Sequence, residues 1–425
     1  MDKTATFRSV KGIISPRFNT LQTKVYMNPD LNHLQPYPFE KLAELKQASI
    51  PPEDKAHIAL SIGEPRHQPP GFVLEKLAAS LDSTGQYPLT RGSLELRSTI
   101  AEWLNRRFKL GQSAAIHPET QVLPVNGTRE ALFAFAQAVV DRNNKPVVLM
   151  PNPFYQIYEG AAILAGATPV FYNTTRETAY LPDFDAIPEN HWQQCQLLYI
   201  CTPGNPTGAV ISKDQLKALI EKAEKYDFII ASDECYSEIY FDENSPPPGL
   251  LEAASEMGND TFKRCIVFHS LSKRSNLPGL RSGFVAGDAE IIKAFFQYRT
   301  YHGCAMPPPT QAASISAWSD EQHVVDNRSM YKEKFNAVLQ ILSPVLDVTL
   351  PDAGFYLWPQ TPVVDTDFAR QLFAEQNITV LPGQFLSRNS NGINPGENHI
   401  RMALVATVEE TIEAANRIYQ FIEKL

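Results

Sequence analysis

The chain has 425 residues, of which 43% are apolar and 20% are charged. This composition is typical of a globular protein with more than one domain, and it excludes a small peptide module and a wholly disordered chain. The formal net charge is -9, so the chain lacks the basic field that binds nucleic acid or an anionic membrane surface. We therefore expect its partners to be small molecules or other protein chains.

The cysteine and hydropathy patterns favour a reducing, cytoplasmic location. The five cysteines are widely spaced, contain no C-x-x-C pair and follow no apolar signal-peptide core. The longest nearly uncharged apolar stretch, residues 131–140, is far shorter than the roughly 20 residues that a membrane-spanning helix needs. We therefore expect no membrane span.

The first 26 residues differ in composition from the rest of the chain. They hold five basic side chains, one acidic side chain and little apolar periodicity. A transit peptide has this character, but a disordered extension or a start at Met27 explains it more simply. We expect residues 1–26 to be a disordered extension and residues 27–75 to contribute to a small domain.

In chain order, a proline-rich run at residues 35–39 precedes a helical pattern at 40–47. From about residue 120, short β-rich runs alternate with helical patterns, which is typical of a mostly parallel sheet with crossover helices. The expected strands are residues 147–150, 197–201, 228–232, 265–268 and 283–286. The chain is therefore predicted to be α/β in this region.

One helix between these strands has clear start and packing signals. Ser212 and Gln215 form a capping-box pattern. Leu216, Leu219 and Ile220 then follow at the spacing of one helical face. We expect this helix to cover one face of the sheet.

Three consecutive prolines at residues 307–309 mark a change in pattern. After them, long helical stretches alternate with short strands. The helices are expected at about 325–345, 366–377 and 408–423, and the strands at 354–358 and 399–405. We therefore expect a large α/β domain at residues 76–310 and a smaller α+β domain at 311–425.

Polar or glycine-rich residues follow most of the predicted strands. In open α/β sheets, ligands bind outside the carboxyl ends of the strands, so these clusters should converge on one site. Residues 126–130 begin a helix, and the free amides at Thr128 and Arg129 would attract an anion such as phosphate. Taken alone, an ordinary helix start explains this pattern as well.

Three further clusters hold candidate functional residues. The loop of residues 202–208 would hold Asn205 rigidly, although a tight turn has the same composition. Asp233 ends an apolar strand, where a buried carboxylate needs a cation unless it only caps a helix. Lys273 follows another apolar strand, where burial would lower its pKa for imine chemistry, unless it is a surface lysine.

The order and spacing of Asn205, Asp233, Lys273 and Arg281 resemble those of fold type I pyridoxal-phosphate enzymes, the class I and II aminotransferases. The resemblance covers nearly all of residues 27–425. The motifs that carry it are residues 61–65, 87–92, 126–130, 151–155, 202–208, 233–236, 270–273 and 399–402. It implies a large, mostly parallel seven-stranded sheet domain, a smaller α+β domain, and pyridoxal 5'-phosphate as the cofactor.

The resemblance assigns roles around the cofactor ring. Lys273 would attach the cofactor covalently and move the proton at the substrate's Cα. Asp233 would pair with the pyridinium nitrogen. Asn205 and Tyr236 would hydrogen-bond the phenolic oxygen, and Tyr155 would stack on the ring. The catalytic set is therefore expected to be Lys273, Asp233 and Tyr236.

The resemblance also assigns residues to the cofactor's phosphate group. Arg281 and Ser270 would bind it together with the helix amides at Thr128 and Arg129, and Ser272 is a weaker candidate. Tyr87 resembles the tyrosine that reaches the phosphate from the partner subunit. This likeness implies a homodimer with composite active sites.

The substrate's α-carboxylate would be bound by Arg401, assisted by the amide of Gly63, with Asn205 as a further candidate. A surface salt bridge is the alternative role for Arg401. The apolar neighbours Ile400 and Met402 argue against that alternative.

Residues 27–42 and 298–306 look like those of succinyldiaminopimelate aminotransferases of bacterial lysine biosynthesis. Such an enzyme transfers an amino group between glutamate and N-succinyl-2-amino-6-oxopimelate by a ping-pong mechanism. Both substrates have acidic distal ends, so we expect cationic or donor groups beyond the ring. Arg66, Arg299 and His302 are the candidates, and structural roles explain them equally well.

Other functions share this set of residues. Other amino-acid transaminases and carbon–sulfur lyases use it too, because the cofactor carries the common chemistry. Pyridoxal-phosphate-sensing transcription regulators carry a winged helix ahead of such a domain, and residues 1–26 are too short for one. Assays of amino transfer and of DNA binding separate these classes.

Overall fold

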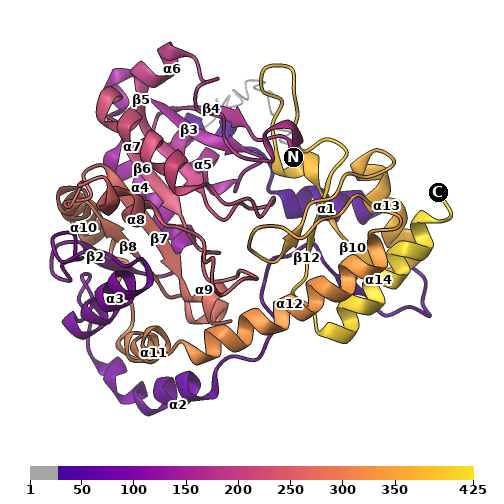
Figure 1. The fold of residues 1–425 in the computed structure, drawn as a ribbon, viewed down its shortest axis with the longest axis horizontal. Coiled ribbons are helices and arrows are strands. Elements are labelled where there is room, and N and C mark those ends of the chain that lie inside the picture. Colours follow the sequence, from indigo (N-terminus) through magenta and orange to yellow (C-terminus); the bar gives the residue numbers. More distant parts are fainter. Residues whose placement is uncertain (1–26) are drawn as a thin grey trace, which may run out of the picture.

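The computed structural model describes residues 27–425. The predicted disordered extension, residues 1–26, lies outside the described residues. Figure 1 shows a large unit built on a sheet and a smaller unit beside it, with the long helix α12 (Gln322–Leu342) running between them. Among the helices of residues 27–425, none combines the length and the apolar character that a membrane crossing demands.

The large sheet has seven strands in the order β2-β8-β7-β6-β5-β3-β4. Only β8 runs antiparallel to its neighbours β2 and β7 in this described sheet. The strands are β2 (Val122–Val125), β3 (Val147–Asn152), β4 (Thr168–Asn173), β5 (Cys195–Cys201), β6 (Ile229–Asp233), β7 (Cys265–Ser270) and β8 (Gly283–Gly287). The predicted mostly parallel seven-stranded sheet is therefore confirmed.

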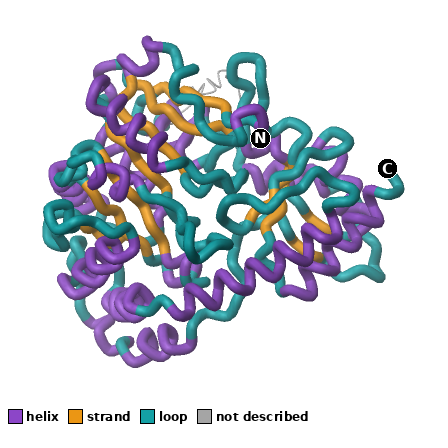
Figure 2. Tube along the Cα trace, viewed as in Figure 1, coloured by secondary structure: helices purple, strands orange, loops and turns teal. Residues whose placement is uncertain are grey.

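Helices cover both faces of this sheet, as Figure 2 shows. Alternate strand residues face opposite layers, because side chains along a strand point to opposite faces. Leu149 and Leu198 belong to one core cluster, whereas their neighbours Val148 and Leu197 belong to the other. The first cluster includes side chains of α3 (Leu94–Arg107), α7 (Lys213–Tyr226), α8 (Leu250–Glu256) and α11 (Pro308–Ser319). The second includes those of α4 (Thr128–Val139), α5 (Ile157–Leu164) and α10 (Ala289–His302).

Helix α7 is the covering helix predicted from its capping pattern. The Ser212 hydroxyl accepts a hydrogen bond from the Gln215 amide at 3.3 Å, and the Gln215 side chain accepts one from the Ser212 amide at 3.0 Å. Leu216, Leu219 and Ile220 are buried against the sheet. This prediction is confirmed.

The smaller unit has an antiparallel three-stranded sheet in the order β11 (Leu381–Pro382), β12 (Ile400–Ala403) and β9 (Tyr356–Leu357). The helices α12, α13 (Asp365–Gln376) and α14 (Val408–Ile422) pack around it. The N-terminal segment reaches this unit, because β1 (Ile58–Ala59) pairs in parallel with β10 (Ile378–Thr379). Helix α1 (Pro38–Lys46) contacts α13.

The packing of α11 bears on the predicted domain boundary at residue 311. This helix contacts α2 (Gly71–Ala79) and α3, and Ala317 and Trp318 lie in the core of the large unit. The boundary stays a prediction, and the packing favours a later position, within α12. Two short helices remain, α6 (Glu189–Gln194) and α9 (Leu271–Arg274).

Candidate functional site

A cavity of about 400 Å³ lies where the carboxyl ends of β6 and β7 face the smaller unit. Most of the functional residues predicted from the sequence line it. They are Gly63, Thr128, Arg129, Tyr155, Asn205, Asp233, Tyr236, Ser270, Ser272, Lys273, Arg281 and Arg401. Tyr87 does not line this cavity, and its side chain is fully exposed at 101%. The strand-end clusters thus converge on one place, as the sheet topology requires.

Lys273 projects from α9, the short helix that follows β7 directly. Its Nζ donates a hydrogen bond to the carbonyl oxygen of Gly63 and lies 5.4 Å from the ring centroid of Phe355. Burial is the main cause that lowers the pKa of Lys273 to about 8. More of this amine is therefore unprotonated near neutral pH than in an ordinary lysine, and the unprotonated form is the nucleophile.

Asp233 ends β6, is buried and lines the cavity. The Tyr158 hydroxyl donates to its Oδ2 at 2.7 Å, and the Cys235 amide donates to its Oδ1 at 3.3 Å. Burial raises its pKa, and within residues 27–425 no lysine or arginine pairs with it. A protonated ring nitrogen beside Asp233 would supply the missing positive charge, so this carboxylate fits a pyridinium cofactor.

The N-terminus of α4 forms an anion seat. Gly127 caps it with a φ of 84°, and no side chain of residues 27–425 bonds the first helical amides. Arg281 crosses this end, and a Cβ on Gly127 would lie 2.2 Å from its Nη2. The hydroxyls of Ser270 and Ser272, 2.9 Å apart, line the same cavity. Free amides, a guanidinium and two hydroxyls suit the phosphate of the cofactor.

The side chain of Arg129 does not belong to this anion seat. Its backbone lies in the first turn of α4, but its exposed guanidinium lies over the ring of Tyr37, 5.2 Å from the centroid. The side chain therefore lies toward Tyr37, which also lines the cavity. Only the backbone amide of Arg129 belongs to the helix N-terminus.

Arg401 lies on β12 and is only 5% exposed. Its Nη1 donates to Asn205 Oδ1 at 2.9 Å, its Nη2 donates to the carbonyl oxygen of Ser61 at 2.8 Å, and its guanidinium lies 4.6 Å from the ring centroid of Tyr356. It forms no ion pair within the described part of the chain, and its Nε has no hydrogen-bond partner there. The surface salt bridge is therefore the wrong interpretation. A buried guanidinium without an anion suits a substrate carboxylate.

Asn205 and Tyr236 present hydrogen-bond donors to the cavity. The Asn205 oxygen already accepts from Arg401, so its amide nitrogen is left to donate. The Tyr236 and Tyr356 hydroxyls lie 2.9 Å apart, and burial raises the pKa of both. Gly63 leaves room for this pair, because a Cβ there would lie 1.9 Å from the Tyr356 hydroxyl oxygen.

Several functional side chains were not predicted from the sequence. Tyr158 bonds Asp233, and its place three residues after the candidate Tyr155 is the only signal that the sequence offers for it. Tyr356 comes from a short apolar strand, and Tyr37 from the proline-rich segment. Neither has a local pattern that ties it to the distant sheet.

The predicted distal cations do not line the cavity. Arg299 is fully buried and pairs with Glu130, with its Nη1 2.8 Å from Oε2. His302 lies with its Nδ1 2.8 Å from Cys304 Sγ. The expectation for Arg299 is therefore wrong, because Glu130 of α4 neutralises its guanidinium. His302 is exposed and lies outside this cavity, so its role stays a prediction. Arg66 is exposed and also lies outside the cavity lining.

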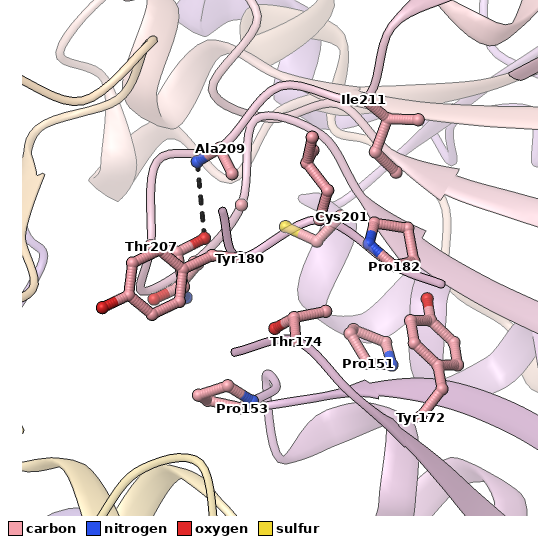
Figure 3. Close-up of a pocket in the computed structure, with 13 residues that line it drawn as sticks. Pro151, Pro153, Tyr172, Thr174, Tyr180, Pro182, Cys201, Thr207, Ala209 and Ile211 are labelled. Carbon is pink, nitrogen blue, oxygen red and sulfur yellow. Dashed lines mark hydrogen bonds between the residues drawn. The ribbon is translucent and has the colours of Figure 1, made fainter. Parts of the chain in front are cut away.

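A second cavity, of only about 30 Å³, lies behind the loop that holds Asn205. Figure 3 shows Cys201, Thr174 and Tyr172 around it, and a hydrogen bond of 3.4 Å from the Ala209 amide to Thr207 Oγ1 that closes the loop. This volume has room for about two water molecules. It is too small for a substrate, so the chemistry belongs to the larger cavity.

Replacing Arg401 with leucine should lower kcat/KM for every amino-acid substrate by about 100- to 1,000-fold, because removing one partner of a buried charge pair costs several kcal/mol. The α-carboxylate is common to all amino acids, so steady-state assays should show losses of similar size. Arg370→Leu is the control, since Arg370 is an exposed arginine paired with Asp367 on α13. A loss confined to one substrate would contradict this role.

Comparisons with known proteins agree with this geometry. The family described as aminotransferase class I and II matches residues 55–418. An LL-diaminopimelate aminotransferase of Syntrophobacter fumaroxidans is 33% identical over 395 residues, which cover 91% of this chain and 97% of that protein.

Two solved structures bear on the same comparison. An aminotransferase from Neisseria meningitidis is 49% identical with a TM-score of 0.89, covering 93% of this chain and all of that chain (100%). A probable N-succinyldiaminopimelate aminotransferase from Thermus thermophilus is 26% identical with a TM-score of 0.79, covering 90% of this chain and 99% of that chain.

Proposed function

Since the chain belongs to the aminotransferase class I and II family and depends on pyridoxal 5'-phosphate, we propose that it transfers an amino group between glutamate and the keto acid of a diaminopimelate-type amino acid in lysine biosynthesis. One observation carries the proposal. A half-buried lysine of lowered pKa shares a cavity with a buried carboxylate and a buried arginine, neither of which has an oppositely charged partner within residues 27–425. Transamination of an α-amino acid needs these three groups.

The residues present fit the cofactor. Asp233, which accepts a hydrogen bond from Tyr158, would hold the ring nitrogen. Asn205 and Tyr236 would hold the phenolic oxygen, and the N-terminus of α4 with Arg281 the phosphate. When bound, pyridoxal phosphate supplies a carbonyl that captures the substrate amine and a ring that withdraws electrons from Cα.

The protein's own groups orient the substrate and move one proton. The Arg401 guanidinium holds the α-carboxylate, and the Gly63 amide is proposed to assist it. Lys273 Nζ takes the proton from the substrate's Cα and can give it up again, because its lowered pKa brings its charged and neutral forms closer in population near neutral pH. The amino group thus passes from donor to acceptor in two half-reactions.

We propose that the active form is a homodimer. Tyr87 is fully exposed and lies outside the cavity of its own chain, and nearby Leu89 is 73% exposed. Exposed aromatic and aliphatic side chains of this kind mark interfaces between protein chains. This exposure supports a role for Tyr87 in the cavity of the partner subunit.

The charge of the cavity favours the succinylated substrate. Among its lining residues, Asp233 is acidic, and it lies at the level of the ring. The basic lining residues are Arg129, Lys273, Arg281 and Arg401. Lys273, Arg281 and Arg401 are assigned to the cofactor and the α-carboxylate, which leaves Arg129 for the distal end of the substrate. The distal end of N-succinyl-2-amino-6-oxopimelate carries only carboxylates, whereas that of free diaminopimelate also carries an ammonium group, which Arg129 disfavours. LL-diaminopimelate stays the second candidate, because relatives such as that of Syntrophobacter fumaroxidans carry its name.

A substrate panel tests the proposal. The wild-type protein should show higher kcat/KM for the succinylated substrate than for LL-diaminopimelate. Arg129→Ala should lower this ratio by about 1.5- to 5-fold, the range for an exposed ion pair, because its guanidinium lies over Tyr37 without an acidic partner in residues 27–425. Arg142→Ala, an exposed arginine away from the cavity, is the control.

Each alternative outcome has a distinct meaning. A wild-type preference for LL-diaminopimelate selects the second candidate, and a preference for a neutral amino acid refutes both. An equal loss on every substrate in Arg129→Ala assigns the arginine to the cofactor instead.

A further inference from the structure

A chain of hydrogen bonds links α12 to the backbone of Lys273. Lys334 Nζ lies 2.6 Å from His67 Nε2, and His67 Nδ1 lies 2.7 Å from Asn327 Oδ1. The Asn327 amide nitrogen donates to the carbonyl oxygens of Lys273, at 3.3 Å, and Arg274, at 3.4 Å. These are last-turn carbonyls of α9, which have no partner within the helix.

The chemistry of the groups fixes which atom donates and which accepts in each of these hydrogen bonds. The ammonium group of Lys334 can only donate, so His67 Nε2 accepts and Nδ1 carries the proton. That proton is donated to Asn327 Oδ1, which also accepts from Asn276 at 2.9 Å. The amide nitrogen of Asn327 therefore faces the two carbonyls, and its orientation is fixed by His67.

Stability alone does not account for Lys334. Lys334 is 1% exposed, and within the described residues it has no ion pair with a carboxylate. Asn327, Tyr331 and Lys334 lie on one face of α12, and the lysine Nζ is 5.1 Å from the Tyr331 ring centroid. Burying a lysine without an acid costs free energy that an apolar side chain would avoid.

The loop of residues 61–67 meets the reacting groups at three points. The Ser61 carbonyl accepts from Arg401, and the Gly63 carbonyl accepts from Lys273 Nζ. His67 then reaches the Lys273 backbone through Asn327. The two ends of Lys273 and the guanidinium of Arg401 are thus tied to one short segment.

We propose that His67 is a positioning residue, which holds the backbone of Lys273 through Asn327 so that the amine and Arg401 keep a fixed separation. This inference rests on the proposed role of Lys273. Burial lowers the pKa of His67 to about 4, so its ring stays neutral and Nε2 stays an acceptor across the physiological range.

Three variants of the holoenzyme test the proposal. His67→Leu and Asn327→Leu should lower kcat about 10- to 100-fold, the loss expected when a reacting group is misplaced by a fraction of an ångström, with KM for the amino donor changed less than about threefold. His67→Asn keeps a donor in place of Nδ1, so it should restore most of kcat.

A spectroscopic readout separates positioning from a general loss of structure. In the absence of substrate, the pH midpoint of the visible absorbance of the Lys273-bound cofactor should shift by about half a unit or more in both leucine variants. His57→Leu is the matched control, because His57 also bonds a side chain, Thr379 Oγ1 at 2.8 Å, but lies away from Lys273. It should leave kcat and the midpoint unchanged.

Unchanged kcat and midpoint in His67→Leu and Asn327→Leu would overturn the proposal, as would a rise in KM alone. If a leucine variant does not fold, Lys334→Met, which removes the donor to Nε2 at similar volume, should shift the midpoint in the same direction, and no shift there overturns the proposal too. Failure of borohydride to fix cofactor on Lys273 of the wild type would instead refute the proposed function.

Discussion

Replacing Lys273 with alanine should abolish amino transfer, lowering kcat by about 10,000-fold or more, because general acid–base catalysis at this scale is lost with the amine. No other lysine lines the cavity within residues 27–425, so none is placed to take over the attachment or the proton. The protein should also lose its visible absorbance and the adduct that borohydride fixes.

Mass spectrometry of borohydride-treated protein measures the attachment directly, and a coupled assay follows keto-acid formation. Lys217→Ala is the control, since Lys217 pairs with Glu256 on the surface, away from the cavity. A Lys273→Ala protein with turnover near the wild-type rate would remove this lysine from the mechanism.

Replacing Asp233 with asparagine should leave a protein that binds the cofactor but has lost about 100- to 1,000-fold in kcat. The neutral amide cannot stabilise a protonated ring nitrogen in a buried site, where one such charge interaction is worth several kcal/mol. The hydrogen bond from Tyr158 can still form to the amide oxygen, so the fold around β6 should persist.

Equilibrium binding of the cofactor and kcat, measured on the same preparation, check this expectation. Asp214→Asn, an exposed carboxylate in the first turn of α7, should change neither quantity. A wild-type rate in Asp233→Asn would place the electron-withdrawing role elsewhere.

Local sequence patterns predict the elements that position the site. The strands and α7 follow from apolar periodicity and from the Ser212 cap, which act within a few residues. Asp233 and Lys273 follow from their places at strand ends, since a parallel sheet brings such ends to one edge. This level of prediction needs no knowledge of distant contacts.

Long-range pairs are the part that the sequence does not reveal. Arg299 resembled a substrate-binding cation until its partner Glu130, 169 residues earlier, was known. The direction of the Arg129 side chain likewise depends on Tyr37, which comes from a separate segment. The sequence therefore shows that a residue is charged. Whether that charge is free to bind a substrate depends on which distant group neutralises it.

The bond between Arg401 and the Ser61 carbonyl joins residues 340 positions apart. During translation, the seven strands of the large sheet leave the ribosome well before β12, which carries Arg401. A nascent chain that ends before this strand already holds Lys273 and Asp233 but lacks the guanidinium for the substrate. Lys273 and Asp233, which are expected to bind the cofactor, are therefore synthesised first. Arg401, which is expected to bind the amino acid, is synthesised later, with β12.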